Sequence, residues 1–407
     1  MYYSRTMKEC WADAGEQFPV LLLTGPRQVG KTTLLQHMCE KGRRYVTLDD
    51  PSIRTLARED PALFLQRFEP PVLIDEIQYA PQLLPLIKIS VDSENIPGRF
   101  WLTGSQQFHM MKGISETLAG RVAILNLLGF SGRERHKLDL NLGPFLPAQT
   151  SLKERAHSTV NSSLKSIYND IWLGAFPSLI AGPVRDRDLF YSSYLQTYLQ
   201  RDVRELTQVG NEAAFVRFLR ACAARTGQML NLTELARDAD VAVNTAKNWL
   251  SILQASFQIF LVSPYHTNLT KRLVKTPKLY FLDTGLCAYL SEWSSPETLA
   301  AGAMSGAILE TYALCELLKS WWHRGKKPLL YYYRDKDHRE IDFLLVQDQV
   351  LYPLEVKKSA SPKREWVGHF SALSRLKLKV GEGGVLCLCK QVMPLTETAN
   401  AIPIGIV

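Results

Sequence analysis

The chain has 407 residues, of which 46% are hydrophobic, and its 48 basic and 40 acidic side chains give a formal net charge of +8. These values exclude disordered, collagen-like and low-complexity proteins, and the length predicts two or three domains. No apolar run reaches the length of about 20 residues that a membrane-spanning helix needs. The first residues also lack the apolar core of a secretory signal. We therefore expect a cytoplasmic protein with no membrane partner.

The cysteines do not have the pattern of a disulfide framework. There are seven of them, an odd number, at irregular spacing, and Cys387 and Cys389 are one residue closer than a Cys-x-x-Cys pair. We expect seven reduced thiols, most of them in protein cores. The positive net charge is compatible with a polyanionic partner such as nucleic acid.

Residues 18–38 have the pattern of a buried strand, a glycine-rich loop and a helix. Gly25, Gly30, Lys31 and Thr32 match the fixed positions of the phosphate-loop motif G-x-x-x-x-G-K-[ST]. In such a loop the backbone N–H groups surround the phosphates of ATP, the lysine contacts the β and γ phosphates, and the threonine hydroxyl binds Mg²⁺. The alternative is a glycine turn beside a surface lysine. The predicted nucleotide-binding residues are Gly25, Pro26, Arg27, Gln28, Val29, Gly30, Lys31, Thr32 and Thr33.

Polar residues follow two later apolar strands. Asp75 and Glu76 come after the strand 72–74, at the carboxyl edge where parallel sheets bind ligands. We expect Asp75 to hold Mg²⁺ through water and Glu76 to orient or deprotonate the attacking water. The alternative is a solvated acidic pair. Ser105 and Gln106 follow the strand 100–103 and are candidates for contact with the γ phosphate or the attacking water.

These segments, together with the Gly-Arg element at residues 118–121, resemble the AAA-type ATPases of bacteria and archaea that carry a family-typical C-terminal domain of unknown function. The resemblance implies that Ser105 or Gln106 senses the state of the nucleotide. It also implies that Arg121 stabilises the charge of the transition state, either in its own subunit or in a neighbouring one. The second arrangement requires a homo-oligomer. The alternative for Arg121 is a structural ion pair with a nearby carboxylate.

The middle of the chain predicts helices and a DNA-reading module. Residues 143–163 form a polar boundary or loop, and the pattern is helical from residue 164. Two short helices, at 231–239 and 244–253, are separated by a tight turn, which is typical of a helix-turn-helix and similar to the winged-helix part of the same family. The alternative is a module that contacts protein. The residues expected to face DNA are Asn244, Thr245, Lys247 and Asn248 in the second helix and Lys271, Arg272, Lys275 and Lys278 in a basic wing.

The C-terminal third carries a carboxylate and lysine pattern on successive predicted strands. Glu355 and Lys357 alternate along one strand, so that both point to the same side, and Asp342 lies on the strand before it. This pattern resembles the PD-(D/E)xK nuclease fold, with Ile341 where the name pattern has proline. The resemblance implies that Asp342 and Glu355 hold Mg²⁺ at the scissile phosphate, that Lys357 positions or activates water, and that Glu310 adds an acid from a helix. The alternative is a nuclease-like domain whose carboxylates only pair with neighbouring basic residues.

The sequence therefore predicts an α/β protein of three parts. A P-loop ATPase domain with a parallel sheet occupies residues 1–142, a helical block with a winged-helix module occupies 164–295, and an α/β restriction-endonuclease-like domain occupies 300–407. The predicted catalytic residues are Lys31, Glu76, Ser105, Arg121, Asp342, Glu355 and Lys357, and the predicted metal ligands are Thr32, Asp75, Glu310, Asp342 and Glu355.

The predicted function is Mg²⁺-dependent binding and hydrolysis of ATP in an action on or with DNA, with a C-terminal domain that either cuts DNA or is inactive. The alternative from a different class is a nucleotide-switched regulator or scaffold with an inactive nuclease-like domain. A third hypothesis is a toxin-like nuclease in stress or defence.

Overall fold

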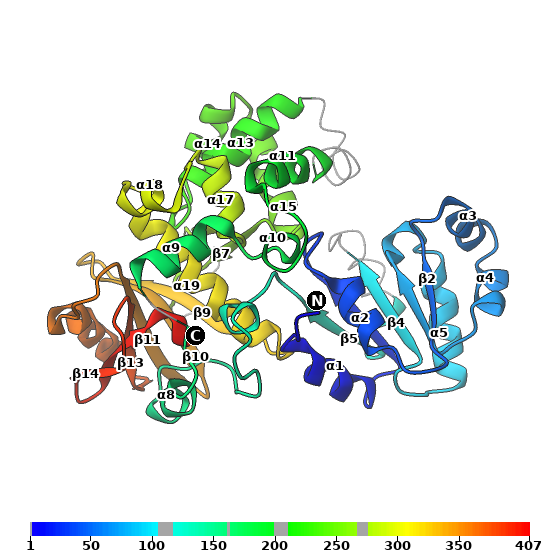
Figure 1. Ribbon diagram of the computed structural model, residues 1–407, viewed down its shortest axis with the longest axis horizontal. Helices are drawn as coiled ribbons and strands as arrows, with labels where there is room; N and C mark the ends of the chain where they lie inside the picture. The colour runs from blue at the N-terminus through cyan, green and yellow to red at the C-terminus, as the bar shows by residue number, and fades with distance from the viewer. Residues whose placement is uncertain (1, 105–116, 161–162, 199–210, 267–275) are drawn as a thin grey trace.

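The structure is a computed structural model that describes residues 2–104, 117–160, 163–198, 211–266 and 276–407 (Figure 1). The N-terminal sheet and its helices form one part of the molecule. The middle helices and the C-terminal sheet lie together on the other side of it (Figure 1). Among the described residues, none of the helices combines the length and apolar character needed to cross a bilayer. All seven cysteines are free thiols, and five of them are buried.

The N-terminal part is a five-stranded parallel sheet with the order β2-β3-β4-β1-β5. The central strands are continuous apolar runs because helices cover both faces of the sheet. Side chains alternate between two cores, so that Leu21 and Leu23 pack on one face while Val20 and Leu22 pack on the other. The strands are β1 (Val20–Thr24), β2 (Arg44–Thr47), β3 (Val72–Asp75), β4 (Phe100–Gly104) and β5 (Val122–Asn126), and the helices are α1 (Met7–Gly15), α2 (Lys31–Met38), α3 (Pro51–Glu59), α4 (Pro61–Arg67) and α5 (Leu83–Ser93). The predicted α/β fold with a parallel-sheet, P-loop ATPase-like N-terminal domain is confirmed.

The segment after β5 holds two short helices, α7 (Gly132–Arg135) and α8 (Gln149–Ala156). The sequence predicts a boundary or loop over 143–163, and α8 lies inside this range. A contact with a distant segment holds this helix in place. The buried Arg155 donates hydrogen bonds to backbone oxygens of Ile406 and Val407, and no local sequence pattern reveals such a contact.

The middle part combines helices with a small antiparallel sheet of order β6-β8-β7. Asn231 caps the first helix of the predicted helix pair, because its side chain accepts a hydrogen bond from the backbone N–H of Glu234 at 3.2 Å. The elements are α9 (Leu164–Leu173), α10 (Pro177–Ile180), α11 (Arg187–Tyr198), α13 (Glu212–Ala224), β6 (Gln228–Met229), α14 (Leu232–Ala239), α15 (Val243–Ala255), β7 (Ile259–Val262), β8 (Lys278–Phe281), α17 (Thr284–Leu290) and α18 (Pro296–Ala301).

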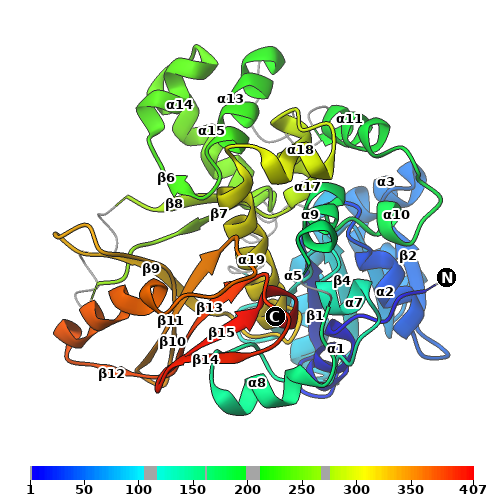
Figure 2. The ribbon, with the colours of Figure 1, turned by 60° about the vertical axis from the view of Figure 1, so that its left-hand side comes forward.

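The C-terminal part is a mixed sheet with the order β14-β15-β13-β11-β10-β9, and β12 pairs with β11. Helix α19 (Ser305–Trp322) crosses the molecule between this sheet and the N-terminal domain, and almost all of its side chains are buried (Figure 2). Apolar residues occupy most of its circumference, and the charged Glu316 and Lys319 are buried together with them. The strands are β9 (Leu329–Arg334), β10 (Glu340–Gln347), β11 (Val350–Lys357), β12 (Lys379–Val380), β13 (Gly383–Cys387), β14 (Met393–Thr396) and β15 (Ala399–Pro403).

Candidate nucleotide site and a second carboxylate cluster

The loop between β1 and α2 has a backbone that only glycine permits at two positions. Gly25 has φ of +147°, and a Cβ at this position would lie 2.0 Å from the carbonyl oxygen of Leu127. Gly30 has φ of +87° and directly precedes α2. None of the described side chains caps the first turn of this helix, so its backbone N–H groups face the loop as an anion site. The local geometry is that of a phosphate-binding loop.

The Lys31 side chain lies inside this loop. It is only 6% exposed, and its ammonium donates hydrogen bonds to the carbonyl oxygens of Gly25 at 3.0 Å and Pro26 at 2.7 Å. These contacts place the positive charge at the centre of the curved backbone. An anion that enters the loop meets this charge together with the N–H groups of α2.

Asp75, at the end of β3, is held by hydroxyl groups from three neighbouring elements. Thr32 of α2 donates to its Oδ1 at 2.8 Å, Thr103 of β4 donates to the same oxygen, and Tyr45 of β2 donates to Oδ2 at 3.2 Å. Burial, followed by the charge of Asp75, raises the pKa of Tyr45 to about 12. The Thr32 hydroxyl and the Asp75 carboxylate therefore converge on one point, and oxygen ligands of this kind fit Mg²⁺.

Glu76 follows with a left-handed backbone, at φ of 60°. Its N–H donates to Thr103 Oγ1 at 3.1 Å, and the Gln78 amide donates to its carboxylate. Such a conformation is strained for a non-glycine residue and is held by these contacts. Glu76 lines a pocket of about 490 Å³, in which the phosphate loop is joined by residues that no sequence motif indicated. The pocket is lined by Arg27, Gln28, Gly30, Lys31, Thr32, Thr33 and Glu76 from the N-terminal part and by Pro177, Ser178 and Thr197 from α10 and α11.

Arg121 lies at the other end of the sheet. It precedes β5, which runs parallel to β1 with Val20 opposite Val122, whereas the phosphate loop follows the carboxyl end of β1. Its guanidinium pairs with Asp92. A role for Arg121 at the nucleotide of its own subunit is therefore wrong, and the structural ion pair is what this chain forms. Contact with the nucleotide of a neighbouring subunit stays a prediction. Ser105 and Gln106 lie outside the described residues.

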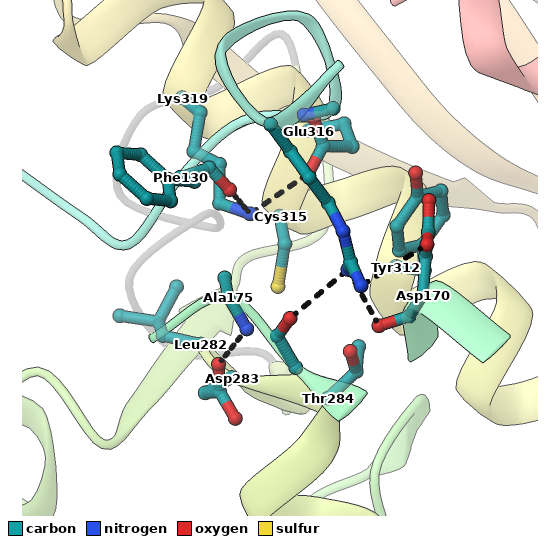
Figure 3. Close-up of a pocket in the computed structure, with 13 residues that line it drawn as sticks. Phe130, Asp170, Ala175, Leu282, Asp283, Thr284, Tyr312, Cys315, Glu316 and Lys319 are labelled. Carbon is teal, nitrogen blue, oxygen red and sulfur yellow. Dashed lines mark hydrogen bonds and ion pairs between the residues drawn. The ribbon is translucent and has the colours of Figure 1, made fainter. Parts of the chain in front are cut away.

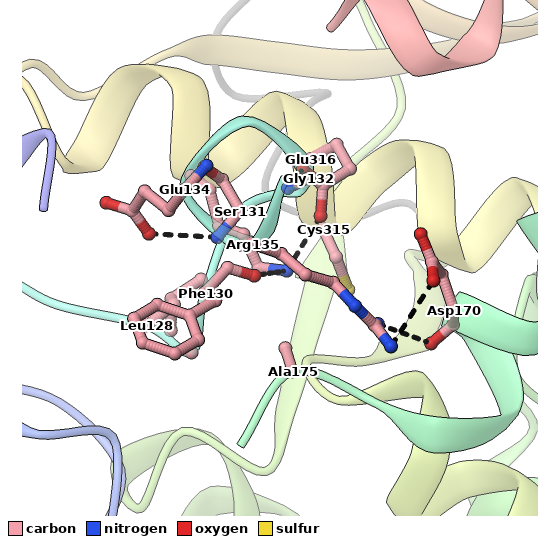
Figure 4. A network of polar contacts seen from close by, with 12 residues as sticks. Leu128, Phe130, Ser131, Gly132, Glu134, Arg135, Asp170, Ala175, Cys315 and Glu316 are labelled. Carbon is pink, nitrogen blue, oxygen red and sulfur yellow. Dashed lines mark hydrogen bonds and ion pairs between the residues drawn. The ribbon is translucent and has the colours of Figure 1, made fainter. Parts of the chain in front are cut away.

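Arg5 connects the phosphate loop to the segment after β5. Its guanidinium donates to the carbonyl of Val29 at 2.9 Å and to that of Leu128 at 2.7 Å, and its Nε lies 3.1 Å from the Glu134 carboxylate. Figure 4 shows Glu134 turned back onto the N–H of Ser131, which donates to it at 2.9 Å. Both charged groups are buried. No local motif marks Arg5, because its partners lie far along the chain.

The same carboxylate faces His323 at the end of α19. The backbone N–H of Leu128 donates to His323 Nε2 at 3.1 Å, so this nitrogen is the acceptor and the ring proton is on Nδ1. Nδ1 lies 3.3 Å from Glu134 Oε1. Burial lowers the pKa of His323. The imidazole is therefore neutral in the folded chain and joins the N-terminal domain to α19.

This neutral histidine predicts a pH dependence of stability. The unfolded chain binds a proton at His323 near pH 6.5, while the folded chain resists protonation until its lower pKa is reached. Stability should therefore fall as the pH drops below about 6.5, by at most about 1.4 kcal/mol per pH unit from this group. His323→Gln should remove this part of the slope in urea unfolding at pH 7.5 and 5.5, whereas His157→Gln, at an exposed position, should keep it. An unchanged slope in His323→Gln would contradict the assignment.

A small polar pocket lies beside this contact, between the segment after β5, α9, α17 and α19 (Figure 3). Lys319 donates to the carbonyl of Phe130 at 2.9 Å and to the Glu316 carboxylate at 2.7 Å. The other oxygen of Glu316 accepts from the N–H of Gly132 at 2.7 Å. Asp283 accepts from the N–H of Ala175 at 2.8 Å. The charged side chains that line the pocket therefore have hydrogen-bond partners within it. The pocket lies where the three parts of the molecule meet.

Asp342, Glu355 and Lys357 come together on β10 and β11. The Lys357 ammonium lies 2.6 Å from Glu355 Oε2 and 4.0 Å from Asp342 Oδ2, and the N–H of Val356 donates to Asp342 at 2.9 Å. Burial, followed by the charge of Asp342, raises the pKa of Glu355 to about 8. Glu355 Oε1 is buried without a hydrogen-bond partner among the described residues. Two adjacent carboxylates with a buried free oxygen fit a cation.

The carboxylate of Glu310 contacts two side chains from the middle part of the molecule. Its Oε1 lies 3.2 Å from the Lys278 ammonium and accepts a hydrogen bond from Tyr280, both on β8. Within the residues that the structure describes, no group of three or more His, Cys, Asp or Glu side chains is arranged to hold a metal ion. The predicted metal set of Glu310, Asp342 and Glu355 is therefore not brought together in this arrangement, because an ammonium occupies the space beside Glu310.

The residues expected at DNA fall into two groups. Asn244, Lys247 and Asn248 are exposed at the start of α15, and Thr245 is half-buried. Lys278 is only 4% exposed and forms ion pairs, so its predicted contact with DNA phosphates is wrong. Lys271, Arg272 and Lys275 lie outside the described residues.

Three segments of the chain match known sequence families. Residues 17–136 match the family described as AAA domain. Residues 164–297 match a domain of unknown function (DUF8612), and residues 305–407 match another domain of unknown function (DUF4143). The chain is also similar to two uncharacterized proteins, from Mycobacterium tuberculosis and Mycobacterium bovis. Each is 29% identical over 388 residues, which cover 95% of this chain and 80% of the relative.

Two solved structures match parts of the chain with low sequence identity and low TM-scores. A Walker-type ATPase of Pyrococcus abyssi is 16% identical with a TM-score of 0.40, over 70% of this chain and 94% of that one. The RuvB Holliday junction branch migration motor of Thermotoga maritima is 15% identical with a TM-score of 0.29, over 62% of this chain and 88% of that one. The AAA match and the geometry of the phosphate loop support an AAA-type ATPase with a C-terminal domain of unknown function.

Proposed function

We propose that this protein binds ATP with Mg²⁺ at residues 25–33, hydrolyses it, and couples this cycle to DNA. The observation that carries the ATPase part is the convergence of the Thr32 hydroxyl and the Asp75 carboxylate beside a buried Lys31 inside a glycine loop. This geometry supports the proposal because a phosphate, a metal ion and the lysine are the groups that hold and polarise ATP in phosphate loops.

Each side chain of the site has a distinct role in this proposal. Lys31 exchanges the carbonyls of Gly25 and Pro26 for phosphate oxygens. Thr32 and Asp75 would hold Mg²⁺, which supplies charge neutralisation when it is bound. Glu76 lies at the next position and orients or deprotonates the attacking water. Ser178 and Thr197 close the pocket from the middle part, so that the helical block senses whether the nucleotide is present.

The DNA part of the proposal rests on the middle module. Along the chain, the elements follow the order α13, β6, α14, α15, β7 and β8, and the three strands form one antiparallel sheet. This order is the one expected of a winged helix. Asn244, Lys247 and Asn248 project from the start of α15, where a recognition helix reads the major groove. A homo-oligomer in the cytoplasm, with Arg121 facing a neighbouring nucleotide, completes the proposal.

A second candidate function is Mg²⁺-dependent cleavage of DNA at Asp342, Glu355 and Lys357. The specific observation in its favour is the buried free oxygen of Glu355 beside Asp342. Lys357 is within 2.6 Å of Glu355 and would position the attacking water. The competing candidate is a nucleotide-switched regulator or scaffold in which these carboxylates only pair with lysine.

The test is ATP hydrolysis by the full chain with Mg²⁺, with and without duplex DNA, while the DNA is followed on a gel in the same tubes. We expect hydrolysis that requires Mg²⁺ and is faster with DNA. Cleavage that disappears in Asp342→Asn would support the nuclease, and intact DNA in all tubes would favour the scaffold. Failure of a fluorescent ATP analogue to bind would overturn the ATPase proposal itself.

A further inference from the structure

Lys278 links the middle module to the carboxylate cluster of the C-terminal part. It is the first residue of β8, where it pairs in register with Met229 of β6 and Val262 of β7. Its ammonium reaches away from this sheet to Glu340 Oε1 at 2.6 Å and to Glu310 at 3.2 Å. Only 4% of the residue is exposed.

A second side chain of β8 makes the same connection. Tyr280 lies two residues after Lys278, on the same face of the strand, and its hydroxyl donates to Glu310. Burial and the charge of Glu310 raise the pKa of this hydroxyl well above its ordinary value, so it remains a donor. Strand β8 therefore directs two donors to one oxygen of Glu310.

The cluster as a whole contains more carboxyl groups than basic groups. Glu310, Glu340, Asp342 and Glu355 contribute four carboxyl groups, and Lys278 and Lys357 contribute two ammonium groups. Arg334 approaches Glu340 from the edge, with its Nε at 3.8 Å from Oε2. The charge of Asp342 acts on Glu310, on Glu355 and on both lysines. The side chains thus form one electrostatic unit in which four carboxyl groups face Lys278, Lys357 and Arg334.

An ammonium beside Glu310 disfavours a divalent cation at the same place. Two positive centres a few ångströms apart repel strongly in a buried environment. The Glu310 oxygen that faces Lys278 and Tyr280 is also no longer free for a metal. Glu355 Oε1 and Asp342 remain, but two carboxylates supply only part of the six or more oxygens that such ions bind.

We propose that Lys278 acts as a built-in cation that keeps a divalent metal ion out of this cluster, and that Glu310, Asp342 and Glu355 form a divalent-cation site when β8 withdraws its ammonium. The inference rests on the second candidate function, DNA cleavage, because it concerns the same carboxylates. It adds that strand β8, which precedes these carboxylates in the chain, controls whether they bind a metal ion.

The test is a titration of the full chain with Mn²⁺ at pH 7.5, without nucleotide, followed by calorimetry. Lys278→Met keeps most of the length of the side chain and removes its positive charge. We expect it to bind Mn²⁺ about tenfold or more tightly than the original chain, a difference of about 1.4 kcal/mol. Adding Asp342→Asn to this variant should abolish the gain, and Lys278→Arg should bind as weakly as the original chain. Lys247→Met, at an exposed lysine of α15, is the matched control.

The double variant Lys278→Met/Glu340→Gln is included in case Lys278→Met alone fails to fold. It removes both members of the 2.6 Å ion pair, so no carboxylate loses its closest partner. The same gain in Mn²⁺ affinity is expected, because Glu340 is not among the proposed ligands. Folded variants that bind Mn²⁺ no better than the original chain would overturn the inference. A gain in Mn²⁺ affinity without any DNA cleavage would refute the nuclease and leave the cation site standing.

Discussion

Replacing Lys31 by alanine is expected to reduce ATP hydrolysis by a factor of about 100 or more, the effect typical of removing a charged group that stabilises the transition state. The ammonium is buried at the centre of the loop, 2.7 to 3.0 Å from two backbone oxygens, so the substitution removes the positive charge that lies inside the curved backbone. Phosphate release by the purified chain under saturating Mg²⁺ and ATP measures this effect. Lys41→Ala, at an exposed lysine just after α2, is the matched control and should hydrolyse ATP normally.

Glu76→Gln separates binding from chemistry at the same site. The amide keeps the size of the side chain and loses the basic oxygen that would accept a proton from water. We expect this variant to retain a labelled ATP after gel filtration while turnover falls, whereas Lys31→Ala retains little. Turnover at the original rate in both variants would show that hydrolysis occurs elsewhere.

Replacing Glu134 by alanine is expected to lower the free energy of unfolding by about 3–5 kcal/mol, the range found when one partner of a buried ion pair is removed. The carboxylate accepts hydrogen bonds from the N–H groups of Thr6 and Ser131, at 2.8 and 2.9 Å, and lies 3.1 Å from Arg5. Its interactions with Arg5 and His323 outweigh burial and hold its pKa well below the ordinary range, so it is ionised in the folded chain. Alanine leaves the guanidinium of Arg5 buried without its counter-charge.

Urea unfolding followed by tryptophan fluorescence measures this loss. Glu16→Ala, at an exposed residue at the end of α1, should change the free energy of unfolding by less than about 0.5 kcal/mol. The double variant Arg5→Met/Glu134→Gln removes both charges and should be more stable than Glu134→Ala, because no unpaired charge stays buried. Equal stability of Glu134→Ala and the original chain would mean that the pair contributes nothing.

The phosphate loop could be predicted from the sequence because its determinants are local. Gly25 and Gly30 are required by backbone angles, and Lys31 and Thr32 follow them directly. The apolar strand before Asp75 also places this carboxylate at the right edge of the sheet. Motif, strand and helix lie within a few residues of one another, so local pattern and tertiary position agree.

Contacts between distant segments could not be predicted in the same way. Arg5 meets Leu128 and Glu134 only after the chain has folded, and Ser178 reaches the nucleotide pocket from another part of the molecule. Lys278 belongs to a basic stretch of sequence that suggests a surface, yet it is buried against carboxylates of α19 and β10. Net charge and periodicity carry no information on such pairs.

Arg121 is a different case, because its position follows from strand direction. A residue before a parallel strand lies at the edge opposite to the residues that follow the neighbouring strands. Val122 pairs with Val20, the first residue of β1, which places Arg121 away from the loop that begins after Thr24. Treating the Gly-Arg element as part of the site followed the family resemblance rather than this geometric rule.

Helix α19 also limits how the chain can be divided. At its C-terminal end, Lys319 donates to the carbonyl of Phe130, and His323 accepts a hydrogen bond from the N–H of Leu128. In its first half, Glu310 forms an ion pair with Lys278 of strand β8. A fragment that stops before α19 would leave the N–H of Leu128 and the carbonyl of Phe130 without these hydrogen-bond partners. The three family segments are thus joined by buried hydrogen bonds, and we expect an exchange of the C-terminal domain between relatives to succeed only if the loop that receives α19 is exchanged with it.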